Sequence, residues 1–139
     1  MLQEISAIII MKKLTRSKLI KKLDNVFSQY IRRKDAIDGI AKCISCGVER
    51  NWKELQCGHF MSRSHYSTRW EILNVGVQCI SCNIFKHGQQ YLFSKYLDKT
   101  FGEGTSNELF LKSQTLGKFT TNEIEEMIKK YKDLLDELK

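Results

Sequence analysis

Residues 43–46 read Cys-Ile-Ser-Cys, and residues 79–82 read Cys-Ile-Ser-Cys again. In each segment the gap of two residues lets both sulfur atoms turn toward one point, and Gly47 supplies the permissive backbone that the first turn needs. Two such knuckles provide four soft ligands, the preferred environment of structural zinc. We therefore predict that zinc is bound by Cys43, Cys46, Cys79 and Cys82. The alternative is a pair of redox-active dithiols.

The size and composition of the chain fit one small folded domain in a reducing compartment. The chain has 139 residues, of which 42% are hydrophobic and 28% charged. Its longest apolar run, residues 5–11, is far shorter than the ~20 residues that cross a bilayer, and its flanking charges are in the wrong order for an export signal. We expect no membrane contact and a cytoplasmic location, where thiols stay reduced. The fifth cysteine, Cys57, is interpreted as a small buried hydrophobe.

The net charge of +7 is unevenly distributed along the chain. Residues 1–42 hold ten basic and four acidic side chains, whereas residues 101–139 hold six and eight. A basic field attracts polyanions, of which nucleic acid is the commonest, although a solvated basic surface is the alternative.

The 32 residues between the knuckles exceed the usual spacing of a zinc ribbon, so they are expected to carry the function. Residues 52–57 alternate as a strand that leads into Gly58-His59-Phe60, and residues 74–79 indicate a second strand. Residues 83–87 are expected to be helical. The order strand, loop, strand, helix, clamped by zinc, predicts an α+β core.

Helices are predicted on both sides of this core. Residues 17–42 are an amphipathic, basic entry helix, because apolar residues recur every three or four positions from Leu19 to Ile31. Residues 91–97 continue helically to Gly102, and residues 107–116 form a short helix closed by Gly117. Thr120 and Glu123 form a capping box that opens the last helix. Its apolar stripe packs on the body or on a second copy, which would make a homodimer.

Four segments follow from these patterns. Residues 1–16 are an N-terminal extension, within which residues 1–10 fit either a short strand or an extension upstream of a second possible start at Met11. Residues 17–42 are the entry helix, residues 43–102 the zinc-clamped core, and residues 103–139 a C-terminal helical extension.

The order Cys-x2-Cys, Gly-His, Asn-x4-Cys-x2-Cys-Asn resembles an HNH endonuclease of the ββα-metal class, and the spacing His59-x14-Asn74-x8-Asn83 is similar to that of its motif. More narrowly, GHFMSR at 58–63, TRW at 68–70 and NVGVQCISCN at 74–83 resemble the phage recombination endonucleases known as NinG or Rap. YIRRKDAIDGIAKCISCG at 30–47 also fits that subgroup. The resemblance covers roughly residues 25–102.

This resemblance implies a zinc-stabilised HNH core that hydrolyses DNA with Mg²⁺ or Mn²⁺, acting on branched recombination intermediates in a bacterial host cell. His59 would be the general base, Asn74 would orient the imidazole through the ring or the strand backbone, and Asn83 would offer its amide oxygen to the catalytic metal. His87, four residues after Asn83 on one helical face, could be a second ligand or a surface histidine.

Each of these residues also has a structural interpretation. His59 could be a buried histidine beside the zinc clamp, Asn74 a turn residue and Asn83 the N-cap of the helix. Many HNH enzymes place Asp or His as a metal ligand where this chain has Gly58, although the subgroup tends to have Gly there. His65 lies in the loop between the strands and is interpreted as solvated, with metal or substrate contact as the alternative.

Six basic residues are candidate DNA ligands. Arg63 and Arg69 flank the loop between the strands and suit bidentate phosphate contact, although Arg69 could instead brace Glu71. Trp70 is interpreted as a core residue. Lys86 lies near the helix start, and the entry helix presents Arg32, Arg33 and Lys34.

Two other classes of protein remain open. One is a zinc module that binds nucleic acid without cleaving it, and the other is a thiol redox or zinc-relay protein.

Overall fold

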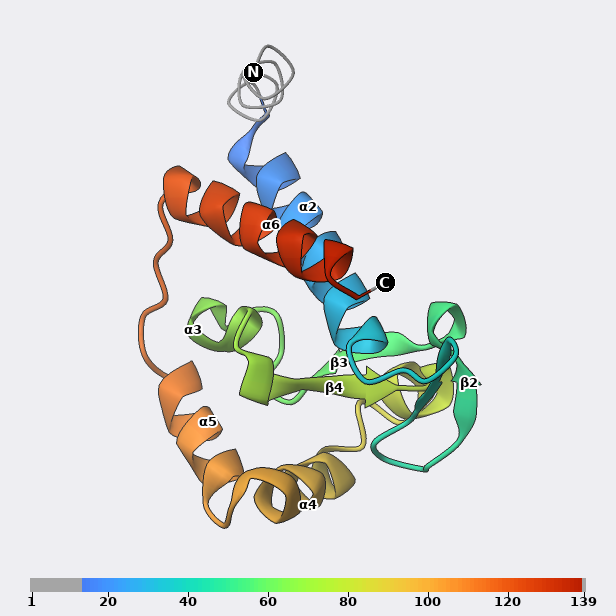
Figure 1. The fold of residues 1–139 in the computed structure, drawn as a ribbon. Coiled ribbons are helices and arrows are strands. Elements are labelled where there is room, and N and C mark those ends of the chain that lie inside the picture. Colours follow the sequence, from blue (N-terminus) through green and yellow to red (C-terminus); the bar gives the residue numbers. More distant parts are fainter. Residues whose placement is uncertain (1–13, 139) are drawn as a thin grey trace. The chain divides into compact units, whose positions relative to one another are not determined.

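The computed structural model describes residues 14–138, so the expectation for residues 1–10 lies outside the described residues (Figure 1). The described chain forms two compact units: residues 14–27 with 119–138, and residues 28–118. Helix α2 (Arg16–Arg33) contributes its first part to one unit and its end to the other.

The first unit packs the start of α2 with helix α6 (Thr121–Asp136). The rings of Phe27 and Tyr131 meet edge to face, with centroids 5.0 Å apart. The expected capping box is present, since Thr120 and Glu123 exchange both hydrogen bonds. The apolar stripe of α6 is buried at Ile124, Ile128 and Tyr131, with Tyr131 against Phe27 of α2, whereas the homodimer stays a prediction.

The second unit contains the two strands that the sequence predicts. Strands β3 (Gln56–His59) and β4 (Val75–Gln78) pair antiparallel, with Gln56 opposite Gln78 and His59 opposite Val75. Helix α3 (Tyr66–Arg69) and the 3₁₀ turn η2 (Ile72–Asn74) connect them. The expected strand at residue 52 begins later, because Trp52–Glu54 form the 3₁₀ turn η1, capped by the Asn51 side chain.

A second hairpin, absent from the sequence prediction, surrounds the first knuckle. Strands β1 (Ile40–Lys42) and β2 (Glu49–Asn51) pair antiparallel, so the predicted entry helix of residues 17–42 ends at Arg33. The knuckle is joined to β4 by a hydrogen bond of 2.9 Å from the Ile44 N–H to the Val77 carbonyl oxygen.

The expected helix at residues 83–87 is also shorter. Ser81–Phe85 form a π-helical turn, η3, and the chain then reverses at His87, whose φ is 53°. Helix α4 (Gln90–Phe101) follows as expected, with Phe93 and Leu97 buried.

Helix α5 (Thr105–Ser113) ends before Gly117, so Gly117 is not its cap. This glycine is required for a different reason, because a Cβ there would overlap the backbone of Ser67. Leu109 of α5 completes a small core with Phe93 and Leu97.

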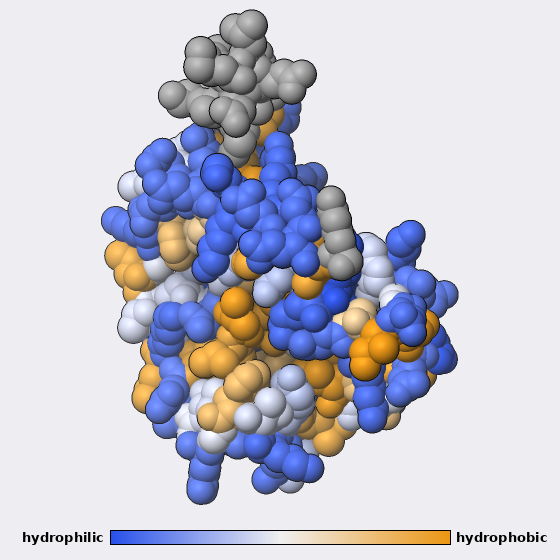
Figure 2. Space-filling model, viewed as in Figure 1, coloured by the Kyte–Doolittle hydropathy of each residue, from blue (hydrophilic) through white to orange (hydrophobic). Residues whose placement is uncertain are grey.

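The surface has both hydrophilic and apolar regions. Figure 2 shows apolar side chains among the hydrophilic ones, and Ile84 and Phe85 of η3 are 52% and 73% exposed. Among residues 14–138 no helix combines the length and the apolar character that crossing a membrane requires.

Candidate functional site

The four cysteines converge as predicted. Their sulfur atoms all lie within 4.8 Å of one another, and those of Cys46 and Cys79 are 3.7 Å apart. The first knuckle lies between β1 and β2, and the second joins β4 to η3. Tetrahedral thiolate coordination with Zn–S bonds of ~2.3 Å needs sulfur separations of this order. The cluster could therefore hold a structural zinc ion.

The electrostatics of the cluster favour a cation. Burial acts to raise the pKa of the Cys43 thiol, but backbone hydrogen bonds from Cys46, Cys79 and Ser45 lower this pKa to about 7. Burial, the neighbouring thiols and the charge on Cys43 raise the pKa of Cys82 to about 12. Four thiols this close cannot all ionise unless a positive charge compensates them, and a divalent metal supplies that charge.

His59 ends strand β3 and is half-buried. Its Nε2 lies 2.9 Å from the carbonyl oxygen of Arg69. A carbonyl oxygen only accepts hydrogen bonds, so Nε2 carries the proton and the neutral ring has its lone pair on Nδ1. Gln56 pairs with Gln78, the residue just before the second knuckle. Gln56 lies three residues before His59, which corresponds to ~10 Å along strand β3. This register separates the imidazole from the cysteine cluster.

Asn74 is fully buried and tied to the loop that follows His59. Its Oδ1 accepts from the Met61 N–H at 2.8 Å, and its Nδ2 donates to the carbonyl oxygens of Met61 at 2.9 Å and Thr68 at 3.0 Å. Thr68 precedes Arg69, whose carbonyl holds the imidazole. Asn74 therefore holds the backbone next to Arg69 through Met61 and Thr68, rather than through the strand backbone or the ring, and its orienting role toward His59 stays a prediction.

Asn83 lies inside η3, whose N-cap is Ile80, so Asn83 is not a helix cap. Its Nδ2 donates to Gln56 Oε1 at 2.7 Å. This bond fixes the amide orientation and turns Oδ1 away from Gln56. Gln56 was not predicted as a site residue, and its one signal in the sequence is the recurrence of Gln-Cys at residues 56–57 and 78–79.

The place of a side chain at residue 58 is already occupied. A Cβ on Gly58 would overlap Oε1 of Gln78, which projects from the opposite strand. Gln78 is fully buried, and its Nε2 donates to Ser45 Oγ and to the Gly88 carbonyl oxygen, both at 2.8 Å. Its Oε1 is buried without a hydrogen-bond partner among the described residues. A ligand at position 58 is thus excluded unless Gln78 moves.

The two remaining histidines lie outside strands β3 and β4. His87 is exposed in the turn after η3, so the helical face that was expected to align it with Asn83 does not form. His65 precedes α3 and is half-buried, and its backbone N–H donates to the Ser62 carbonyl oxygen.

One arginine of the loop, Arg69, is held by aromatic rings. The Arg69 guanidinium lies over Tyr66 and Trp70, 5.0 and 5.4 Å from the ring centroids, and donates to the Arg63 carbonyl oxygen at 2.8 Å. Trp70 is 7% exposed, which confirms its assignment to the core. Glu71 forms an ion pair with Lys112 at 2.8 Å.

A second basic cluster surrounds Trp52. Arg32 and Arg33 each lie 5.1 Å from the Trp52 ring centroid. Arg32 also donates to the Trp52 carbonyl oxygen at 3.3 Å, and burial lowers its pKa, so it braces the fold. Lys34 pairs with Asp35 at 2.7 Å. Cys57 is half-buried, and Lys86 is exposed in the turn after η3.

These residues define a small α+β protein in which a four-cysteine cluster, able to bind zinc, clamps an antiparallel hairpin and the turn after it. The family model of the bacteriophage lambda NinG protein matches residues 8–139, and the chain belongs to that family. No curated protein and no solved structure matches the chain.

Proposed function

We propose that the protein is a metal-dependent endonuclease of the HNH type that cleaves branched DNA during phage recombination. The observation that carries the proposal is the hydrogen bond from His59 Nε2 to the Arg69 carbonyl oxygen. This bond selects the tautomer in which Nδ1 can accept a proton, which is the property that a general base requires.

The hairpin residues have complementary roles in this proposal. Nδ1 of His59 takes a proton from the water that attacks the scissile phosphorus, and the Arg69 carbonyl stabilises the imidazolium that forms. Asn74 is a positioning residue, because it holds the loop that carries this carbonyl. The resulting geometry exists before substrate binds, so no reorganisation is needed at the moment of reaction.

Asn83 is the residue proposed to hold the catalytic Mg²⁺ or Mn²⁺, because its amide oxygen is turned away from Gln56. Hard cations prefer oxygen ligands, and Mg²⁺ commonly takes several of them from water and substrate phosphates. When bound, such an ion would supply stabilisation of the charge on the leaving oxygen. His87 remains a candidate second ligand, now in a turn rather than on a shared helical face.

The proposed DNA contacts lie on the same unit. Arg63 and Lys86 are exposed on the loops at the two sides of the hairpin, and Arg33 is stacked on Trp52. Arg69, which lies over two aromatic rings, and Lys34, which pairs with Asp35, are proposed as additional DNA contacts. Arg32 is proposed to support the DNA-binding surface through its hydrogen bond to the Trp52 carbonyl oxygen. Such contacts to phosphate fix orientation and supply affinity that falls with salt.

Cleavage assays test the proposal. The purified protein is incubated with branched and linear DNA, with and without Mg²⁺ or Mn²⁺, beside His59→Ala. The matched control is His65→Ala, which removes a half-buried loop histidine outside the proposed chemistry. Metal-dependent cleavage that His59→Ala abolishes and His65→Ala retains is the expected result.

The second candidate is a zinc module that binds nucleic acid without cleaving it. The cations around Trp52 favour it, because an aromatic ring flanked by Arg33 and Lys53 combines a stacking surface with positive charge, which suffices to bind DNA without hydrolysing it. Binding of branched DNA by wild type and His59→Ala alike, with no cleavage in either metal, would establish this candidate and refute the first.

A further inference from the structure

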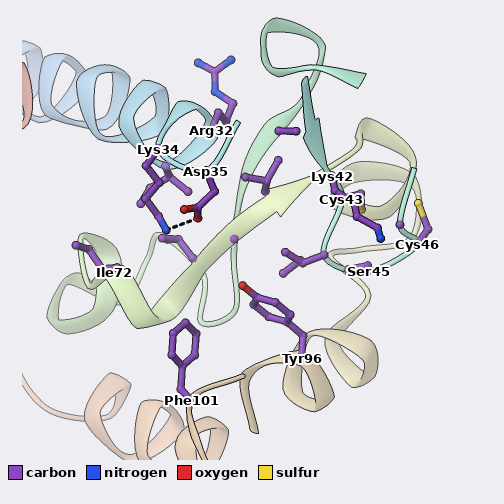
Figure 3. A pocket seen from close by; sticks show the side chains of 17 residues that line it. Arg32, Lys34, Asp35, Lys42, Cys43, Ser45, Cys46, Ile72, Tyr96 and Phe101 are labelled. Carbon is purple, nitrogen blue, oxygen red and sulfur yellow. Dashed lines mark hydrogen bonds and ion pairs between the residues drawn. The ribbon is translucent and has the colours of Figure 1, made fainter. Parts of the chain in front are cut away.

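A cavity of about 640 Å³ opens beside the first knuckle (Figure 3). It lies within the unit of residues 28–118 and is lined by the end of α2, the knuckle, strand β4 and helix α4. Pockets that hold small molecules have volumes of ~300–1,000 Å³, so this one can hold a molecule the size of a nucleotide.

Two aromatic rings form one wall of the cavity. Tyr96 and Phe101 extend from α4, with ring centroids 6.3 Å apart and an interplanar angle of 87° (Figure 3). Phe101 is 48% exposed although it is a large apolar residue. Burial raises the pKa of the Tyr96 hydroxyl, so this group stays neutral and can donate or accept a hydrogen bond.

The polar lining complements a nucleotide. Lys42 and the Lys34–Asp35 pair contribute to the cavity wall, and Ser45 adds a hydroxyl. The ammonium groups suit a phosphate, whereas the Asp35 carboxylate and the Ser45 hydroxyl can accept from the amino groups of a base edge. An apolar ligand would leave these groups unused.

The position of the cavity connects it to the proposed catalytic residues. Ile72 and Val75 of its lining flank Asn74 in the sequence. Val75 is the strand partner of His59, and directly opposed Cβ atoms in an antiparallel pair are ~4.5–5.5 Å apart. A nucleotide in the cavity would therefore lie one strand away from the candidate general base.

We propose that this cavity binds one unpaired nucleotide of branched DNA, with the base against Phe101 and Tyr96 and the phosphate near Lys42. The inference rests on the proposed function, because it specifies which feature of the substrate the protein recognises. A base in a matched duplex is stacked between its neighbours and cannot enter, so the cavity distinguishes an unpaired nucleotide from matched duplex DNA.

Fluorescence titration tests this inference without requiring cleavage. The probe is 2-aminopurine placed as a single unpaired nucleotide at the branch of a three-way junction, and the reference is the same base in a matched duplex. Both are titrated with the full-length protein without added Mg²⁺ or Mn²⁺. We expect stacking to quench the unpaired probe, and Phe101→Ala to lower the preference for it by about tenfold, with duplex affinity unchanged.

The matched control is Phe110→Ala, because Phe110 is also 48% exposed but lies on α5, outside the cavity. Lys42→Ala is a second variant at an exposed position and should weaken binding of the unpaired probe several-fold. Equal preference in Phe101→Ala and Phe110→Ala, or no quenching with wild type, would overturn the inference. A preference that depends on Phe101, together with no cleavage of the same DNA once Mg²⁺ or Mn²⁺ is added, would instead refute the endonuclease proposal alone.

Discussion

Replacing Asn74 by Ala should destabilise the protein more than most single substitutions. The side chain makes three hydrogen bonds to the backbone of Met61 and Thr68, and it is fully buried. Each bond contributes about 1 kcal/mol net, and the backbone groups left without partners add a desolvation penalty. The expected loss in the free energy of unfolding is therefore about 3–5 kcal/mol.

Urea unfolding followed by tryptophan fluorescence measures this loss. The matched control is Asn122→Ala, because Asn122 is exposed and its amide makes a bond of 3.2 Å to Glu126. We expect the control to stay within about 0.5 kcal/mol of wild type. A loss below about 1 kcal/mol in Asn74→Ala would contradict the network described above.

The pH dependence of the stability of Asn74→Asp provides a second test of this network. The new carboxylate would face the carbonyl oxygens of Met61 and Thr68, whereas the protonated acid can still donate to one of them. Burial raises the pKa of this new carboxyl in the folded state. Ionisation of the new carboxyl therefore does not destabilise the folded protein below the unfolded-state pKa, and the destabilisation develops as the pH rises from there through the folded-state pKa. Stability of Asn74→Asp that is independent of pH would refute this account.

Three further substitutions test other parts of the structure. Cys82→Ser should abolish the binding of one zinc ion per chain and lower the melting temperature, whereas Cys57→Ser, outside the cluster, should retain the metal. A chromophoric chelator measures the bound zinc in each variant. Gly58→Ala should lower the free energy of unfolding in urea by about 1–3 kcal/mol, because the new methyl group overlaps Gln78. If the losses of Gly58→Ala and Gln78→Ala simply add in the double variant, the contact between the two residues is contradicted. The backbone and side-chain hydrogen bonds to Thr120 lower the pKa of Glu123. The ionised carboxylate therefore contributes stability above the ordinary glutamate pKa, and this contribution is lost as the pH falls through the lowered pKa. Glu123→Gln should remove this pH dependence of the melting temperature.

The sequence predicted those features whose signals are local. Two Cys-x2-Cys knuckles specify four converging ligands by spacing alone, and the capping box of Thr120 and Glu123 is complete within four residues. The second strand of the core hairpin was also predicted closely, because residues 75–78 run directly into a knuckle. Each of these features needs no knowledge of distant contacts.

Features that depend on distant contacts were missed. Strands β1 and β2 have three residues each, too few to show alternation, and they exist because the knuckle between them closes a tight hairpin. The helix expected at residues 83–87 stops because His87 and Gly88 both adopt positive φ values. The hydrogen bond between His59 and the Arg69 carbonyl joins residues ten positions apart, and no periodicity encodes it.

Gln78 explains how a structural metal site can position residues that do not bind its metal. The Gln78 amide donates to Ser45 inside the first knuckle, and Gln78 immediately precedes Cys79 of the second. The same side chain packs on Gly58, next to His59, and Gln78 is the strand partner of Gln56, which orients Asn83. The Gln78 side chain thus contacts Ser45 and the space beside Gly58, while its backbone pairs with Gln56, so this one residue connects the first knuckle to both positions of strand β3. The resemblance to HNH enzymes made the glycine at position 58 look like a missing ligand, whereas the packing gives it a role of its own: only a residue without a Cβ lets Gln78 connect the cysteine cluster to the hairpin.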